Sequence, residues 1–333
     1  MIRASVRSTA LHGWHDMLAV KGHQLGENIA ENPHSPRSDM MSLQDFVSFS
    51  EGVVQQARDV AIPWLVGTHY DLVNLGQIGP AILSANSVGV ALRRLVDYFA
   101  LLQDSTDIAL HRDEQSATVS YRILSPDIWP RHQDAMFTLG IVSQLLRQGQ
   151  GSGWDRINFA FEAERHDMRG DIGQVLNAPC SFGADTNQIR FPAAFLDLAL
   201  RAEPQHSDVG ALNRAIAQQR RQTPIIDRMA QLVFRDLNSF AVDQARLARE
   251  IGMSDRTMRR KLADAGSSYQ QVLDECRMRQ AAFEFQTRPE LSIAQIALRL
   301  GYAEHSNFTR AFQRWSGMAP QTYRAQLAQH RAQ

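Results

Sequence analysis

The N-terminal part of the chain alternates between two kinds of hydrophobic pattern. Apolar residues recur every three or four positions in "MSLQDFVSFSEGVVQQARDV" (41–60), "NSVGVALRRLVDYFALL" (86–102) and "QDAMFTLGIVSQLLRQ" (133–148), which predicts amphipathic helices. Apolar and polar residues alternate in "SATVSYRIL" (116–124), "RINFAFEA" (156–163) and "NQIRF" (187–191), which predicts strands. The pattern therefore predicts an α+β domain in this part of the chain.

A different pattern occurs twice in the last third of the chain. The stretches "LAREIGMSDRTMRRKL" (247–262) and "IALRLGYAEHSNFTRAF" (296–312) each contain an aliphatic residue and an alanine, then an aliphatic residue and a glycine. A polar stretch and an apolar pair follow the glycine in both copies, and the second copy is longer in the turn. The glycines and apolar pairs are Gly252 with Met258 and Leu262, and Gly301 with Phe308 and Phe312. Such a repeat predicts one supersecondary unit present twice.

Each copy is typical of a helix-turn-helix. The apolar spacing before the glycine fits one face of a short helix, and the glycine stands where a helix ends in a left-handed cap. We expect Ser254 or Ala303 to open a second helix, whose buried face is the apolar pair. Its outer face then carries side chains of the types that contact base edges and phosphates. These are Arg256, Thr257, Arg259 and Arg260 in the first copy, and His305, Ser306, Asn307 and Arg310 in the second.

One uninterrupted helix is predicted between the two copies. Nothing breaks a helix from Tyr269 to Gln286, and Pro289 beyond them stops one. These positions span roughly 27 Å at about 1.5 Å per residue. Successive major-groove faces on one side of a duplex are ~34 Å apart. One chain could therefore engage two consecutive grooves.

The charge of the chain is unevenly distributed. Its 35 Lys+Arg balance 35 Asp+Glu, but residues 221–333 hold 17 basic and 11 acidic side chains. Only Lys21 and Lys261 are lysines, so the basic groups are almost wholly guanidinium, which suits bidentate contact with phosphates and guanine edges. Composition alone is equally consistent with a solvated helical surface. It is the repeat that favours nucleic acid.

Several classes of protein are disfavoured. No stretch approaches the ~18 apolar residues of a membrane helix, and His12, His15 and Asp16 interrupt any signal-peptide core, so we expect a cytoplasmic protein without a membrane partner. The two cysteines, Cys180 and Cys276, provide neither a disulfide framework nor a multi-cysteine zinc site. A metal site at the terminal histidines is less expected than plain surface histidines, and we expect no cofactor.

The doubled unit is similar to the DNA-binding part of AraC/XylS transcriptional regulators. The similarity rests on the repeat, on "LSIAQIALRLGY" (291–302) and above all on "SNFTRAFQRWSGMAPQTYR" (306–324), and covers roughly residues 222–326. It implies double-stranded promoter DNA and RNA polymerase as partners, and activation more often than repression. One departure is Tyr269, which stands where the second copy has Pro320. By resemblance the base-reading positions are Arg256, Arg259, Arg260, His305, Ser306, Asn307 and Arg310.

The N-terminal part resembles the arabinose-binding-type sensor domain found ahead of the same DNA-binding unit. The similarity rests on the stretches 83–102 and 175–200, and it implies a small-molecule effector and a homodimer. We expect an α+β effector-binding and dimerisation domain over 1–205, a linker over 206–222, and an all-α domain of two helix-turn-helix units joined by a long helix over 223–333. The residues we expect to line an effector pocket are Tyr98, Trp129, Arg131 and His132.

Two classes of function stay open at this point. The first is a transcription factor controlled by an effector, and the second is an enzyme or a reactive-thiol sensor fused to a DNA-binding module. Residues 1–220 show no nucleophile–base spacing, metal set or phosphate loop, so we expect no catalysis. Cys180 has no basic residue or second cysteine beside it, and lies in an expected strand, so we expect a small core residue.

Overall fold

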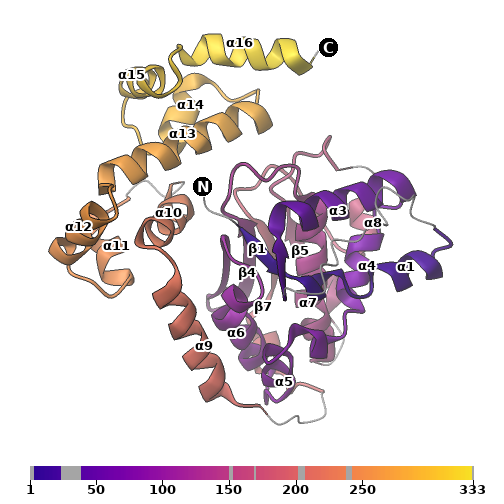
Figure 1. Cartoon of the computed structure of the whole chain (residues 1–333). Helices are drawn as coiled ribbons and strands as arrows, with labels where there is room; N and C mark the ends of the chain where they lie inside the picture. The colour runs from indigo at the N-terminus through magenta and orange to yellow at the C-terminus, as the bar shows by residue number, and fades with distance from the viewer. Residues whose placement is uncertain are drawn as a thin grey trace. The chain divides into compact units, whose positions relative to one another are not determined.

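The chain is organised as two units. A computed structural model describes residues 4–23, 39–149, 153–168, 170–201, 207–237 and 242–331. The N-terminal unit comprises Met1–Ile123 and Ile128–Gln219, and the C-terminal unit comprises Leu124–Asp127 and Arg220–Gln333. The N-terminal unit combines sheet and helices, whereas the secondary structure described in the C-terminal unit is all helical (Figure 1). The expected fold class is confirmed.

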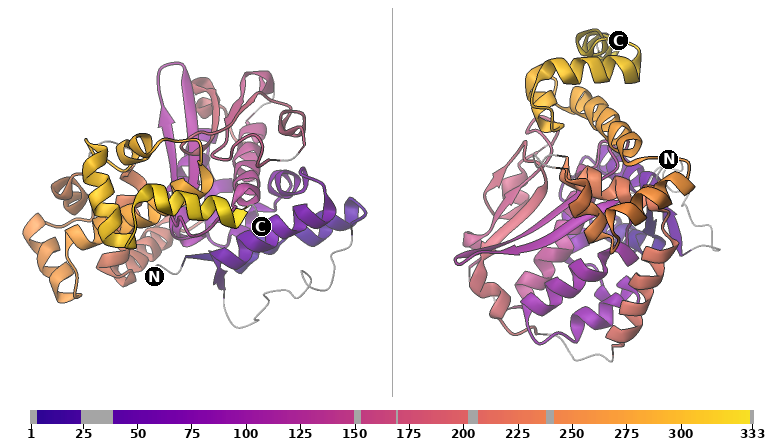
Figure 2. Two further views of the ribbon diagram at one scale, coloured as in Figure 1. Left: turned by 90° about the horizontal axis from the view of Figure 1, so that it is seen from above. Right: turned by 90° about the vertical axis from the view of Figure 1, so that its left-hand side faces the viewer.

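A five-stranded sheet forms one layer of the N-terminal unit. Its strand order is β3-β4-β7-β5-β6, and all neighbours are antiparallel except β5 and β6. The strands are β3 (Thr106–Arg112), β4 (Ser116–Ile123), β5 (Asn158–Ala160), β6 (Cys180–Ser181) and β7 (Asn187–Pro192). β4, β5 and β7 confirm the three expected strands. β3 was not predicted, and with β4 it forms a long hairpin at the edge of the sheet (Figure 2).

The helices of the N-terminal unit confirm the three that the periodicity predicts. These are α3 (Leu43–Ala57), α6 (Val88–Tyr98) with the short 3-10 helix η3 (Phe99–Leu101), and α7 (His132–Gln148). Ser42 caps α3 and Ser87 caps α6 by accepting a backbone N–H. The other elements are β1 (Ser5–Arg7), η1 (Ser8–Leu11), α1 (Trp14–Val20), β2 (Met40–Ser42), α4 (Ile62–Thr68), η2 (Leu72–Leu75), α5 (Ile78–Leu83), η4 (Trp154–Arg156), α8 (Ile172–Leu176) and η5 (Ala193–Asp197).

The centre of the N-terminal unit is the packing of α7 against α4. α7 is buried along almost its whole length. The two helices approach closely because glycines face each other, and a β-carbon at Gly67 would lie 2.2 Å from the carbonyl oxygen of Phe137 and 2.9 Å from Cα of Gly140. Neither position has room for a larger side chain, which explains the choice of residue.

The stretch expected to be a linker contains helix α9 (Val209–Gln222). Leu212 and Ile216 are buried in the core of the N-terminal unit. The hydroxyl of Tyr98 donates to Oδ1 of Asn213 at 2.9 Å, and Nε2 of Gln219 donates to the carbonyl of Ala100 at 2.7 Å. α9 therefore packs on the α6–η3 segment as far as Gln219.

The C-terminal unit consists of seven helices within the described residues. They are α10 (Ile225–Asp236), α11 (Gln244–Glu250), α12 (Asp255–Asp264), α13 (Tyr269–Thr287), α14 (Ile293–Arg299), α15 (His305–Ser316) and α16 (Pro320–Arg331). α13 is continuous over the predicted range and one residue beyond it. Around its C-terminal half Phe285 packs against Phe308, Phe312 and Tyr323. Pro320 stands at the first position of α16, where its missing N–H costs no hydrogen bond.

Candidate nucleic-acid interface and internal cavity

The first helix-turn-helix is formed by α11 and α12. Gly252 follows α11 with φ +74°, and a β-carbon there would meet nothing within 4 Å, so the backbone conformation and not space calls for glycine. Ser254 caps α12 by accepting from the backbone N–H of Thr257 at 3.2 Å. Met258 and Leu262 are fully buried. All three features were predicted from the sequence.

The second helix-turn-helix is formed by α14 and α15. Ser292 and Gln295 form a capping box that opens α14, and Gly301 has φ +77°. The expected start of the next helix at Ala303 is wrong, because α15 begins at His305 with Glu304 in extended conformation as its N-cap. The carbonyl of Glu304 accepts from the backbone N–H of Asn307 and Phe308. The longer turn of this copy thus moves the N-cap one residue along the chain, from Ala303 to Glu304.

The outer faces of α12 and α15 carry the eight predicted side chains. Seven of them are exposed and Thr257 is half-buried, with its hydroxyl 2.9 Å from that of Ser254. The exposed seven are Arg256, Arg259, Arg260, His305, Ser306, Asn307 and Arg310. The structure therefore presents one polar patch on each second helix. Base contact by these residues stays a prediction.

The arginines on these faces differ in their present partners. Arg259 pairs with Asp255 one turn earlier at 2.8 Å, and Arg310 donates to Oδ1 of Asn307 at 2.7 Å. Arg256 and Arg260 make no hydrogen bond or ion pair to any of the residues that the structure describes. They lie one turn apart on α12, so the first patch offers two guanidinium groups without a protein partner.

Polar contacts attach the second helix-turn-helix to α13. Nε of Arg277 donates to the carbonyl of Leu300 at 3.0 Å, and its guanidinium lies 4.6 Å from the ring centroid of Tyr302. The buried carboxylate of Glu284 receives Nε of Arg299 at 3.2 Å. These contacts fix the C-terminal end of α14 and the turn that follows it to the long helix.

The four residues expected to bind the effector fall into two places. Trp129 and His132 pack edge to face with centroids 4.7 Å apart, and Arg131 lies 5.7 Å from the Trp129 centroid. Arg131 is already engaged by a buried ion pair with Glu162 at 2.6 Å, and burial lowers the pKa of His132 to about 4. Tyr98 instead contacts α9 through Asn213. The structure thus brings three of the four together, and their role stays a prediction.

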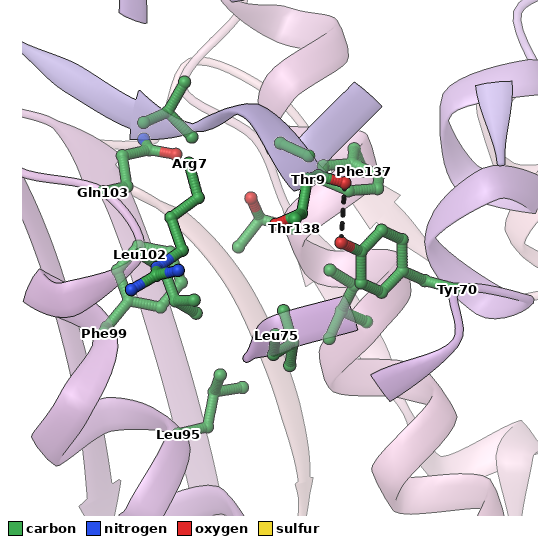
Figure 3. A pocket seen from close by; sticks show the side chains of 13 residues that line it. Arg7, Thr9, Tyr70, Leu75, Leu95, Phe99, Leu102, Gln103, Phe137 and Thr138 are labelled. Atoms are coloured by element: carbon green, nitrogen blue, oxygen red, sulfur yellow. Dashed lines mark hydrogen bonds between the residues drawn. The ribbon is translucent and has the colours of Figure 1, made fainter. Parts of the chain in front are cut away.

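A cavity of about 40 Å³ lies between β1, η1, the α6–η3 segment and α7 (Figure 3). Apolar side chains form most of its wall, including Leu75, Leu95, Phe99 and Phe137. The polar residues of the lining include Thr138, Gln103, Arg7 and Tyr70. The hydroxyl of Tyr70 donates to the Thr9 carbonyl at 2.8 Å. None of the four predicted effector residues lines it.

A buried polar cluster backs the cavity. Nε2 of Gln103 donates to the hydroxyl of Tyr121 at 2.7 Å, and Tyr121 donates to Oδ2 of Asp134 at 2.5 Å. Burial raises the pKa of Asp134 to about 7 and holds the pKa of Tyr121 well above its usual range. Sequence reasoning missed this cluster, since its members stand alone in three different elements.

Comparison with known proteins identifies the family. The arabinose-binding domain of AraC transcription regulators, N-terminal, matches residues 29–200, and a helix-turn-helix domain matches residues 247–326. The chain belongs to the AraC family of transcription regulators. It is a transcriptional regulator with an arabinose-binding-type N-terminal domain and a helix-turn-helix DNA-binding domain.

Relatives of this AraC-family chain are similar along most of their length. The ornithine utilization regulator of Pseudomonas aeruginosa is 27% identical over 292 residues, which are 85% of this chain and 84% of that protein. An HTH-type transcriptional regulator of Mycobacterium tuberculosis is 27% identical over 299 residues, 86% of this chain and 85% of the relative. The crystal structure of the transcriptional regulator CdpR from Pseudomonas aeruginosa aligns with 95% of this chain and 98% of its own, at 23% identity and a TM-score of 0.43.

Two remaining sequence predictions concern Cys180 and membranes. Cys180 begins strand β6, as expected, and is half-buried against the core of the N-terminal unit. Burial raises the pKa of its thiol to about 11, so the thiol is protonated near neutral pH. This disfavours a reactive-thiol sensor in this AraC-family regulator.

Among the described residues, no helix has the length and apolar character needed to span a membrane.

Proposed function

We propose that this AraC-family regulator reads promoter DNA with two helices of each protomer, α12 and α15, under the control of a small-molecule effector held by the N-terminal unit. The observation that carries the proposal is the pair of exposed polar patches, one on each second helix, joined by the single continuous helix α13. Helices of this kind enter the major groove with such side chains toward base edges. Two patches joined by one helix therefore favour two contacted groove segments per protomer.

We assign base-reading roles by side-chain chemistry. The free guanidinium groups of Arg256 and Arg260 suit guanine O6 and N7, and Asn307 beside Arg310 suits adenine N6 and N7. Arg259 forms an ion pair with Asp255. We assign it to a phosphate or to a base edge, depending on the DNA sequence that is bound. Thr257, His305 and Ser306 complete the two patches.

The wider proposal concerns assembly and context. The regulator acts in the cytoplasm as a homodimer whose 1–205 domain holds the effector and the dimer contact, and 223–333 holds the DNA. Helix α9 (Val209–Gln222) lies within the segment 206–222 that joins them. Activation through RNA polymerase is the expected outcome, by analogy with the family.

The experiment that tests the proposal is selection followed by footprinting. Genomic fragments bound by the purified full-length protein are enriched, and the tightest is probed with hydroxyl radicals. We expect two protected segments per protomer, about 10 base pairs apart on one face of the duplex. One protected segment per protomer would show that only one helix-turn-helix reads DNA, and the absence of any preferred sequence would contradict sequence-specific regulation.

A further inference from the structure

The lining of the cavity is almost wholly apolar and includes one charged residue. Among its lining residues Arg7 is the one charged side chain, and no acidic side chain lines it. Nε of Arg7 donates to the carbonyl of Leu101 at 3.1 Å, which fixes the guanidinium along the wall beside Phe99 (Figure 3). Arg7 makes no ion pair with any carboxylate in the part of the chain that the structure describes. A cation with no counter-ion at an apolar cavity favours an anionic ligand.

The other lining residues restrict the chemical class of the ligand further. Leu75, Leu95 and Phe137 present only carbon to the cavity, whereas Gln103 and Thr138 present neutral polar groups. An ammonium group would meet the Arg7 charge and no carboxylate, so amines and diamines fit poorly. An apolar body with one carboxylate satisfies both parts of the wall.

We propose that this cavity is the effector site, that it takes a small aliphatic or aromatic monocarboxylate, and that its occupation is transmitted to α9 through the Phe99–Gln103 segment. The inference rests on the proposed control by an effector and names the site, the chemistry of the ligand and the first element that responds.

The size of the cavity explains why binding has a structural consequence. Its volume is about 40 Å³, whereas an apolar cavity that holds benzene measures about 150 Å³. A monocarboxylate of several carbons therefore enters only if the wall moves outward. The wall includes Phe99, Leu102 and Gln103, which belong to η3 and the residues that follow it.

The same segment holds α9. Tyr98 donates to Asn213 at 2.9 Å, and the carbonyl of Ala100, one residue after Phe99, accepts from Gln219 at 2.7 Å. A shift of the wall therefore displaces two anchors of α9. Because α9 ends at Gln222 and α10 begins at Ile225, its displacement acts directly on the start of the C-terminal unit.

The binding test uses a panel of probes on the full-length protein. Butanoate, hexanoate, benzoate and phenylacetate are compared with hexanamide and hexylamine by thermal shift and by titration calorimetry. We expect at least one carboxylate to raise the melting temperature saturably with one site per protomer, and the amide and amine of equal length to bind at least about tenfold more weakly. No shift with any carboxylate, or equal binding of the amide, would overturn the proposal.

Variants locate the bound ligand. Arg7→Gln should weaken carboxylate binding about tenfold or more while leaving hexanamide unchanged, and Arg93→Gln, an exposed arginine of α6 that does not line the cavity, should change neither. Ala10→Val fills part of the cavity and should abolish binding with the melting temperature of the free protein retained. If Arg7→Gln binds hexanoate as the parent does, the ligand lies elsewhere.

The coupling test measures DNA affinity with and without the carboxylate that binds. Gln219→Ala removes one anchor of α9 and should keep the ligand affinity but reduce the ligand's effect on DNA affinity, whereas Gln218→Ala, its exposed neighbour, should preserve that effect. An unchanged ligand effect in Gln219→Ala, or no ligand effect in the parent, would refute transmission through this segment. Failure of the proposed function itself looks different, because the free protein would then bind no DNA sequence preferentially.

Discussion

At the scale of single residues, the side chains that we assign to DNA contact differ in the protein partners that they have in the absence of DNA. Arg260 has no protein partner within the described residues, whereas Arg310 already donates to Asn307. A free guanidinium gives up only water when it binds a guanine. Arg310 and Asn307 are instead hydrogen-bonded to each other one turn apart, so the same part of α15 presents both the guanidinium and the amide.

Replacing a base-reading arginine should cost specificity more than general affinity. Arg260→Ala and Arg310→Ala should each lose about 1–3 kcal/mol of specific binding and relax the preference at one base pair. Fluorescence anisotropy with the selected site and with single-base variants of it measures both effects. Arg221→Ala, an exposed arginine at the end of α9, is the control. Uniform weakening on every sequence would indicate a phosphate contact, and unchanged binding by both variants would refute the assignment.

The buried carboxyl of Asp134 should make the folded state less stable at higher pH. Burial raises its pKa from 3.8 to about 7, so the folded state binds the proton more tightly than the unfolded state, and stability falls as pH rises through this range. Burial lowers the pKa of His132 to about 4, so its contribution to the pH dependence has the opposite sign. It makes the folded state more stable as pH rises, up to the unfolded pKa of 6.5. The fall due to Asp134 is therefore clearest between about pH 6.5 and 8, where it amounts to about 1 kcal/mol.

Thermal unfolding of Asp134→Asn measures this contribution. The amide keeps the size of the side chain and removes the ionisable group, so the melting temperature should fall less between pH 6.5 and 8 than in the parent protein. Asp97→Asn, on the exposed side of α6, should follow the parent profile. An unchanged profile in Asp134→Asn would mean that Asp134 is ionised throughout this range.

At the scale of elements, the contact between α4 and α7 depends on glycine. Gly67→Ala would place a methyl group 2.2 Å from the Phe137 carbonyl, and the two helices would have to separate. We expect a loss of about 3 kcal/mol or more in the unfolding free energy of the N-terminal unit. Gly173→Ala in α8, whose nearest neighbour would be at 3.4 Å, should change stability by less than about 1 kcal/mol. Equal effects of the two substitutions in denaturant unfolding would contradict the packing argument.

Elements with a strong periodicity could be predicted from the sequence, and those without it could not. The apolar pair and the glycine of the first helix-turn-helix are local signals, so α12 appears where it was expected. α13 was expected because nothing breaks a helix from Tyr269 to Gln286. β3 is half-buried on both faces, so it has no clear alternation, and α9 buries only Leu212 and Ile216 in a mostly polar sequence, so it was interpreted as a linker. The cavity has no local signal at all, because Arg7, Gln103 and Thr138 come from segments that only the folded chain brings together.

At the scale of the whole molecule, we predict that α13 sets the spacing of the DNA segments that the regulator accepts. α13 is one continuous helix. The second helix-turn-helix contacts it directly, through Arg277 and Leu300, whereas α10 packs against both α13, through Cys276 and Ala230, and α12 of the first helix-turn-helix. If α13 holds α12 and α15 rigidly, the two helices contact a duplex at a fixed separation. The two base segments must then lie about 10 to 10.5 base pairs apart.

Changing the spacing between the two segments of the selected site tests whether α13 holds the two reading helices at a fixed separation. Inserting about five base pairs between the two segments turns one of them to the far side of the duplex and should reduce specific binding to the level of a single segment. Full-length protein on the parent site should also lose affinity with salt more steeply than on the inserted site, because more phosphates are neutralised there. Insertion of a full turn, about ten base pairs, restores the face but not the distance, so binding should stay weak. Recovery with the full-turn insertion would show that the helix-turn-helix units move independently and that α13 does not hold them at a fixed separation.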